Sequence, residues 1–179
     1  MSDAQHGSTP ELTPIPLDEV TVDPFTVFDV DWAVIVSEKD GAVNAMTISW
    51  GSLGTLWNIP QATVFVEPSR HTYGLMEGSM SYSICWLGEE HRETLSYLGR
   101  VSGRDEDKLA IAGFDVARAA GGTPYIAQSD SVIICKKMYS QRLDLELMED
   151  QSIRQRTYEP DEPGHEMFIG EVIEVLAAP

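Results

Sequence analysis

The chain has 179 residues, with 12 basic and 29 acidic side chains and a net charge of −17. Hydrophobic residues make up 42% and charged residues 23%, which fits one globular domain and excludes a collagen-like or mainly disordered chain. The charge also argues against nucleic acid as a partner, because proteins that bind it neutralise phosphates with clustered lysine and arginine.

Targeting, membrane and metal signals are weak in this sequence. Residues 1–10 carry no basic segment and no apolar run, and no stretch of about 18 apolar residues predicts a membrane span. Cys85 and Cys135 are too few for a disulfide framework, and the histidines are scattered rather than spaced as zinc ligands. We therefore expect a cytoplasmic protein with no membrane contact and no metal site.

In chain order, residues 1–24 come first and hold four prolines and no basic residue, which predicts an extended arm ahead of a domain over 25–179. Apolar and β-branched runs predict strands at 32–37, 43–49, 63–67, 79–86, 131–138 and 166–176. Asp40 and Gly41 lie between the first two strands and predict a hairpin turn.

Short helices are predicted between these strands, at 70–77, 89–98 and 105–112. Ser69 is the expected N-cap of the first, Gly99 is expected to end the second, and Gly113 follows the third. Long connections are expected at 117–124 and 153–164. Many strands at short spacing with few helices favour an antiparallel barrel over a doubly wound sheet.

Three polar stretches stand where predicted strands or helices meet turns. They are Asn44 to Ser52, Pro68 to Thr72, and Ser102 to Asp105. In the second, two hydroxyls, an arginine and a helix start converge, which suits an anion. Each stretch alone is explained as well by ordinary cap and turn chemistry, but together they favour a bound phosphate compound. Eight of the 12 basic residues lie within 67–140, which supplies local positive charge in an acidic chain.

The sequence at these stretches resembles the flavin reductase-like family, whose members are FMN-binding, flavoredoxin-like split barrels. The resemblance covers roughly residues 25–176. It rests on NAMTISWGSLGTLWNIPQATVFVEPSRHTYGLME at 44–77, SGRDEDK at 102–108 and GHEMFIGEVIEVL at 164–176. It implies a mainly β fold, an antiparallel split β-barrel of Greek-key type with a few short helices, in a homodimer that holds FMN near the subunit interface.

The resemblance also implies roles for particular residues. The cofactor's ring and ribityl chain would lie along Asn44, Ala45, Met46, Thr47, Ile48, Ser49, Trp50 and Gly51. Its phosphate would be held by the segment containing Pro68, Ser69, Arg70 and Thr72, with Ser102 and Arg104 near the same end. His165 matches a position close to the reactive face of the ring and is the expected catalytic residue. Trp50 and Trp57 fit either a core or interface position or a contact with the cofactor.

The leading function implied by the resemblance is hydride transfer from NADH or NADPH to flavin. The alternative is a flavoredoxin-like carrier that passes electrons from its FMN to a protein partner and does not oxidise NAD(P)H. A flavin-storage or regulatory protein without turnover is a third reading. The acidic surface mildly favours a basic protein partner over an anionic nicotinamide.

Overall fold

The structure is a computed structural model that describes residues 11–178. Its strands are β1 (Thr13–Pro14), β2 (Ala33–Lys39), β3 (Ala42–Ile48), β4 (Gly51–Leu56), β5 (Ile59–Val66), β6 (Ser81–Trp86), β7 (Val116–Arg118), β8 (Pro124–Ile126), β9 (Ser131–Arg142) and β10 (Glu166–Ala177). Its α-helices are α1 (His71–Gly78), α2 (Arg92–Arg100), α3 (Lys108–Ala112) and α4 (Gln151–Thr157). Short 3-10 turns lie at Leu17–Glu19, Glu89–His91 and Leu145–Leu147. No helix in residues 11–178 is both long and apolar enough to cross a membrane.

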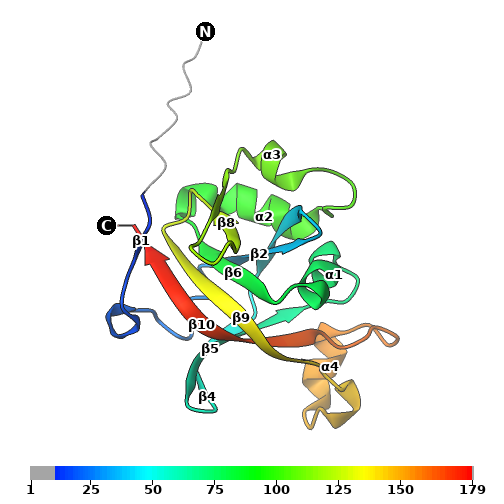
Figure 1. The fold of residues 1–179 in the computed structure, drawn as a ribbon. Coiled ribbons are helices and arrows are strands. Elements are labelled where there is room, and N and C mark those ends of the chain that lie inside the picture. The colour runs from blue at the N-terminus through cyan, green and yellow to red at the C-terminus, as the bar shows by residue number, and fades with distance from the viewer. Residues whose placement is uncertain (1–10, 179) are drawn as a thin grey trace.

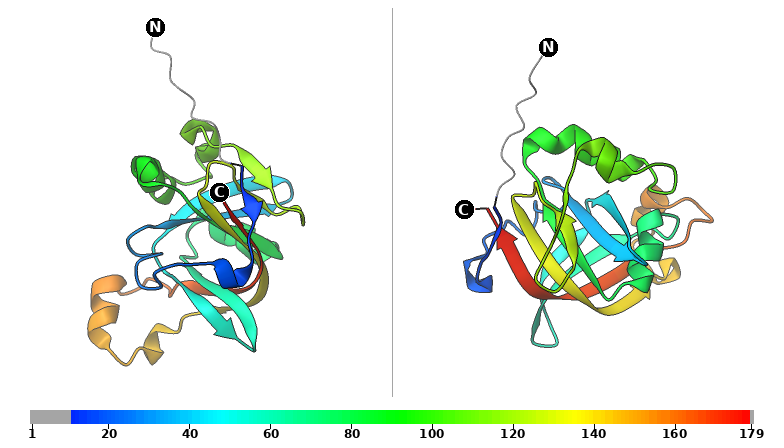
Figure 2. Two further views of the ribbon diagram at one scale, coloured as in Figure 1. Left: turned by 90° about the vertical axis from the view of Figure 1, so that its left-hand side faces the viewer. Right: turned by 45° about the horizontal axis from the view of Figure 1, so that its top comes forward.

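The main sheet is antiparallel, with strand order β3-β2-β6-β9-β10-β5-β4 and β1 paired to β10. It curls so strongly that β9 and β10 wrap around the other strands (Figure 1; Figure 2, right). Within residues 11–178 no pairing joins β3 to β4, the two ends of this order, so the barrel is not closed. The predicted mainly β, antiparallel fold with a few short helices is confirmed, and β3 keeps an open edge.

Two apolar cores lie on opposite faces of the curled sheet. Along β2, Ile35 joins the core inside the barrel, with Phe168 and Tyr82. Val34 and Val36 face the other way, into the core beneath α2 and α3. All of β2 from Ala33 to Ser37 is buried, because successive side chains enter different cores. The α2 and α3 helices cover that outer face, as Figure 1 shows.

The β2–β3 hairpin is confirmed. Asp40 and Gly41 both have positive φ, 53° and 83°, as a two-residue hairpin turn with the twist of the strands requires. The end of α3 at Gly113 (φ 70°) is also confirmed, although α3 begins at Lys108 rather than Asp105. Its N-cap is Asp107, whose carboxylate accepts from the amide of Ala110.

Two predicted helix boundaries are wrong. Ser69 does not cap α1; the N-cap position is Arg70, and the Ser69 hydroxyl donates to the carboxylate of Glu67. Gly99 does not end the second helix, because α2 continues to Arg100. A Cβ at Gly99 would lie 3.4 Å from Thr47 Cβ, so the glycine lets α2 approach β3 closely.

The expected N-terminal arm is only partly described, because residues 1–10 lie outside the described residues. From residue 11 onward the chain is attached to the barrel: β1 pairs with β10, and the Ile15 amide donates to Val175 at 2.9 Å. Ile15 also packs against the inner core. The structure thus places residues 13–15 of the predicted arm along β10.

Candidate functional site

Two adjoining cavities form a groove along the open edge of β3. One, of about 230 Å³, is called here the outer cavity. The other, of about 100 Å³, is called the basic pocket. Both are lined by Met46 and Arg70. The outer cavity is also lined by Thr47, Ile48, Ser49, Trp50, Phe65, Glu67 and His165. The basic pocket is also lined by Asn44, Ser69, His71, Thr72, Val101, Ser102, Gly103, Arg104 and Lys108.

The basic pocket collects basic side chains from three elements. Arg70 and His71 come from the start of α1, Arg104 from the loop after α2, and Lys108 from the first residue of α3. In the part of the chain that the structure describes, no aspartate or glutamate lines the pocket. Burial, with the charges of Arg104 and Lys108, lowers the pKa of His71. A cavity of this kind in a chain of net charge −17 is suited to an anion.

Lys108 is the least expected member of this pocket. It is only 3% exposed, and its Nζ donates to the Leu98 carbonyl at 2.8 Å. Within residues 11–178 no carboxylate lies at ion-pair distance from it. Burial, with the nearby charge of Arg70, lowers the pKa of Lys108 to about 8. A buried ammonium with one neutral acceptor is costly, and a bound anion would compensate that cost.

Two arginines hold the loops of the pocket together. Arg70 Nη2 donates to the Gly99 carbonyl at the end of α2, and Arg104 Nη1 donates to the Ser69 carbonyl at 2.9 Å. Within the pocket, Ser102 Oγ accepts from the amide of Arg104 at 3.2 Å. The segment before α1 and the loop after α2, distant in sequence, therefore form one wall.

Asn44 supports this wall from β3. Its buried amide donates to Thr72 Oγ1 at 2.7 Å, which leaves the Thr72 hydroxyl hydrogen free to donate to a ligand. A Cβ on Gly103 would overlap the amide oxygen of Asn44 and come within 3.0 Å of His71. Glycine is therefore needed at 103 for the loop backbone to reach the pocket floor.

The outer cavity is lined by aromatic groups and by the edge of β3. The ring centroids of Trp50 and His165 lie 4.6 Å apart. The ring of Tyr158 also packs against His165, with 5.6 Å between the centroids. His165 Nδ1 is buried without a hydrogen-bond partner in the described chain. Burial is the main cause that lowers the pKa of His165, so its imidazole is neutral near pH 7. The Trp50 and His165 rings both line the outer cavity and can contact a flat ligand there.

Most residues expected at a cofactor site line this groove, but four contribute differently. Ala45 is fully buried in the core beneath the helices, so its side chain faces away from the groove. Thr47 lines the outer cavity, but its hydroxyl donates to the Leu95 carbonyl at 2.6 Å. Gly51 and Pro68 line neither cavity; Gly51 packs against Phe28, and Pro68 follows the end of β5. Trp50 and Trp57 are 41% and 59% exposed, which excludes a core role for both.

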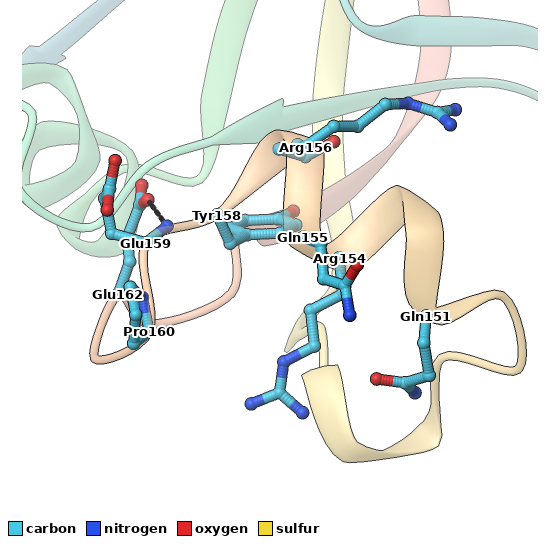
Figure 3. A pocket seen from close by; sticks show the side chains of 9 residues that line it. Gln151, Arg154, Gln155, Arg156, Tyr158, Glu159, Pro160 and Glu162 are labelled. Carbon is cyan, nitrogen blue, oxygen red and sulfur yellow. Dashed lines mark hydrogen bonds between the residues drawn. The ribbon is translucent and has the colours of Figure 1, made fainter.

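A larger cavity of about 490 Å³ lies beside α4 and shares no lining residue with the groove, although Tyr158, which lines it, contacts His165. Figure 3 shows that Arg154 and Arg156 point in different directions there, while Glu159 and Glu162 lie at the other end. Arg154 is paired with Glu146 at 2.8 Å. The charged groups of this cavity therefore do not converge on one position, unlike those of the basic pocket.

Comparison with known families decides the affiliation. The model of the flavin reductase like domain matches residues 28–179, which is most of the chain. The chain belongs to the flavin reductase-like domain family. The resemblance seen in the sequence is thereby confirmed, and the groove of this family member is built from the segments that carried it. No curated protein matched the chain.

Solved structures of low sequence identity share the fold. The FMN-binding domain of a flavin reductase-like enzyme from Shewanella baltica is 17% identical, with a TM-score of 0.69 over 96% of this chain and 80% of that one. Flavoredoxin from Methanosarcina acetivorans is 21% identical, with a TM-score of 0.64 over 82% and 68%. A protein from Shewanella frigidimarina, described as a flavin reductase with a split barrel domain, is 18% identical, with a TM-score of 0.64 over 84% and 70%. The split-barrel architecture is thus common to all of them.

Proposed function

We propose that this family member binds FMN in the groove, with the phosphate in the basic pocket and the ring in the outer cavity. Lys108 carries the proposal, because a buried ammonium without a carboxylate partner marks the pocket as built for an anion. The family and the FMN-binding proteins of the same fold support FMN as that anion's carrier. The phosphate would receive hydrogen bonds from Arg70, Lys108 and the Thr72 hydroxyl.

The outer cavity suits a flat ring with polar edges. β3 ends the sheet order, so part of its backbone near Met46 and Ile48 faces the groove rather than another strand. Backbone N–H and C=O groups there can bond a heterocycle as they would a neighbouring strand. Trp50 and His165 provide the aromatic end of the cavity. These residues bind and orient the ring and partly shield it from water.

For the reaction, we propose oxidation of NADH or NADPH, with FMN supplying the hydride-accepting chemistry when bound. The flavoredoxin-like alternative is electron transfer to a protein partner without nicotinamide oxidation. The chain's charge of −17 favours this alternative, because an acidic surface attracts a basic partner.

The homodimer and the cytoplasmic location remain predictions. The exposed rings of Trp57 and Tyr139, with centroids 6.3 Å apart, offer apolar surface for a dimer interface.

A visible absorption spectrum, recorded without oxygen, separates these functions. We expect the FMN-loaded protein to be yellow and to bleach when NADH or NADPH is added. If it stays oxidised with both nicotinamides yet is reduced by a partner protein, the carrier function replaces the reductase. A protein that takes up no FMN would contradict both.

Replacing His165 with glutamine should slow reduction by the nicotinamide while leaving FMN affinity nearly unchanged. His165 lines the outer cavity but not the basic pocket, so it acts on the ring end only. The expected loss is roughly a hundredfold in the reduction rate, the lower end of the usual range for a positioned histidine. Stopped-flow absorbance measures the rate, and a fluorescence titration measures FMN affinity. If the FMN of the variant is reduced as fast as that of the unmodified protein, His165 has no role in the reaction.

FMN affinity should fall as the pH rises through about 8. Burial holds the pKa of Lys108 at about 8 in the FMN-free protein, so the ammonium loses its proton there. A phosphate dianion binds the protonated form better, and the dissociation constant should rise by at most about tenfold per pH unit. Titrations between about pH 7 and pH 9 test this, with Lys108→Met as the control that should flatten the dependence. An unchanged slope in that variant would assign the effect to another group.

A further inference from the structure

A second, more apolar pocket of about 400 Å³ adjoins the outer cavity. It shares Ser49, Trp50 and Phe65 with the groove but does not include His165 or any residue of the basic pocket. Its walls are mostly aromatic and aliphatic: Pro24, Phe25, Phe28, Trp50, Phe65 and Leu143. It is called the aromatic pocket below. Nothing in the proposed binding of FMN uses the residues 24–29 or Leu143 that form its far side.

The back of the aromatic pocket is fixed by close packing. Phe28 is buried and lies 5.6 Å from the ring of Trp86, measured between centroids. A Cβ on Gly51 would come within 2.6 Å of the Phe28 ring, so only glycine at 51 leaves this ring in place. Gly51, which lies outside the groove, is therefore explained as part of the aromatic pocket.

The front of the pocket displays an aromatic ring to water. Phe25 is 88% exposed, although the backbone that carries it is held in a turn. Its amide donates to Asp23 Oδ1 at 2.9 Å, and the amide of Val27 donates to the Asp23 carbonyl at 3.0 Å. Phe25 lines the same pocket as Trp50 and Phe65, so a flat apolar compound bound there would cover part of this exposed ring.

The charge of the aromatic pocket limits what can bind. Among the described residues, Asp29 is its single charged lining residue, and Ser49 provides a hydroxyl. No arginine, lysine or histidine within 11–178 lines it, in contrast to the basic pocket. A carboxylate near an apolar site repels an anion, since part of the screening water is displaced there. Because its mostly apolar walls also make the burial of any ion costly, the pocket is suited to an uncharged compound and disfavours an anion most.

We propose that the aromatic pocket binds an uncharged planar aromatic compound, held among Phe25, Trp50 and Phe65 beside the flavin groove. That this compound is a second substrate rests on the proposed function, because it would lie next to the flavin, across the shared wall at Trp50, only if FMN is bound in the groove. Binding itself depends only on residues of this chain.

The test is calorimetric titration of 2-naphthol, with 2-naphthoate as its anionic counterpart, into the protein with and without FMN. We expect 2-naphthol to bind both forms and 2-naphthoate to bind at least about tenfold more weakly. Phe25→Ala should weaken 2-naphthol by roughly tenfold while FMN affinity stays unchanged. Leu147→Ala, which removes an exposed apolar side chain outside the pocket, is the control and should bind 2-naphthol as before.

Several results would overturn the proposal. FMN displacing 2-naphthol would assign the aromatic pocket to the flavin site, and equal binding of 2-naphthoate would refute the preference for a neutral ring. Unchanged 2-naphthol affinity in Phe25→Ala would show that Phe25 does not contact the bound compound. If Phe25→Ala instead changes the size of the protein in gel filtration, the patch contacts a second copy. Naphthol binding by a protein that takes up no FMN would support the pocket and refute only the proposed flavin function.

Discussion

Replacing Arg70 with alanine is expected to weaken FMN binding by about 1.5–3 kcal/mol, the scale of a charged hydrogen bond. That corresponds to roughly a tenfold to hundredfold higher dissociation constant. Arg70 lines both cavities and also bonds the Gly99 carbonyl, so its loss removes a phosphate ligand and loosens the wall that holds the others. Quenching of flavin fluorescence in a titration of the FMN-free protein measures the change.

Arg100→Ala is the matched control for this variant. Arg100 is an exposed arginine in the last turn of α2, lines neither cavity, and changes the net charge by the same amount. A long-range effect of charge on the FMN phosphate would appear in both variants, while a direct contact appears only in Arg70→Ala. Equal FMN affinities in the two variants would place the phosphate elsewhere.

Lys108→Met is expected to separate ligand binding from stability. In the FMN-free protein the ammonium is buried with one carbonyl partner, so the free energy of unfolding should be equal or higher after its removal. FMN affinity should fall by about 1.5–3 kcal/mol, because the phosphate loses a charged donor. Urea unfolding without FMN and a fluorescence titration with FMN measure the two quantities.

The changes in stability and in FMN affinity of Lys108→Met together distinguish a ligand-binding role from a packing role. Lys136→Met, at an exposed lysine of β9, should change neither quantity appreciably. If Lys108→Met destabilises the FMN-free protein strongly and leaves FMN affinity unchanged, Lys108 serves the packing of α3 against α2. That outcome would remove the observation on which the proposed function rests.

Strands with a strong local signal could be predicted from the sequence. The Asp40-Gly41 turn determined the β2–β3 hairpin, because few residues adopt positive φ at two successive positions. The small and mixed residues of β4 carried no such signal, and its turn uses Trp57 and Asn58 at positive φ, without a glycine. Along β10, bulges after Ile169 and Val172 break the two-residue alternation that the sequence suggests.

α4 was missed for a physical reason. It overlaps the predicted connection at 153–164 and buries none of its residues, so it needs no apolar stripe. Its start depends on the Asp150 carboxylate, which accepts from the amide of Ser152 at 2.9 Å. Such local capping gives a weak signal in sequence, because aspartate before serine is equally common in turns.

The residues of the candidate site also divide into those that a local sequence pattern predicts and those that it does not. Arg70 and Arg104 were expected because each stands beside serine and glycine or proline in a turn, a pattern typical of anion sites. Lys108 directly follows an acidic run, Asp105 to Asp107, and no local pattern marks it as a pocket residue. It is buried because α3 begins at Lys108, where the side chain reaches the Leu98 carbonyl at the end of α2. That contact depends on how two helices pack, which no local pattern encodes.

The most direct test of the phosphate assignment compares FMN with riboflavin, which has the same ring and ribityl chain but no phosphate. Both are titrated into the FMN-free protein, and the dissociation constants are obtained from flavin fluorescence. With Arg70, Lys108 and Thr72 on the phosphate, FMN should bind at least about a hundredfold more tightly than riboflavin. Equal affinities would contradict the assignment of the basic pocket to the phosphate.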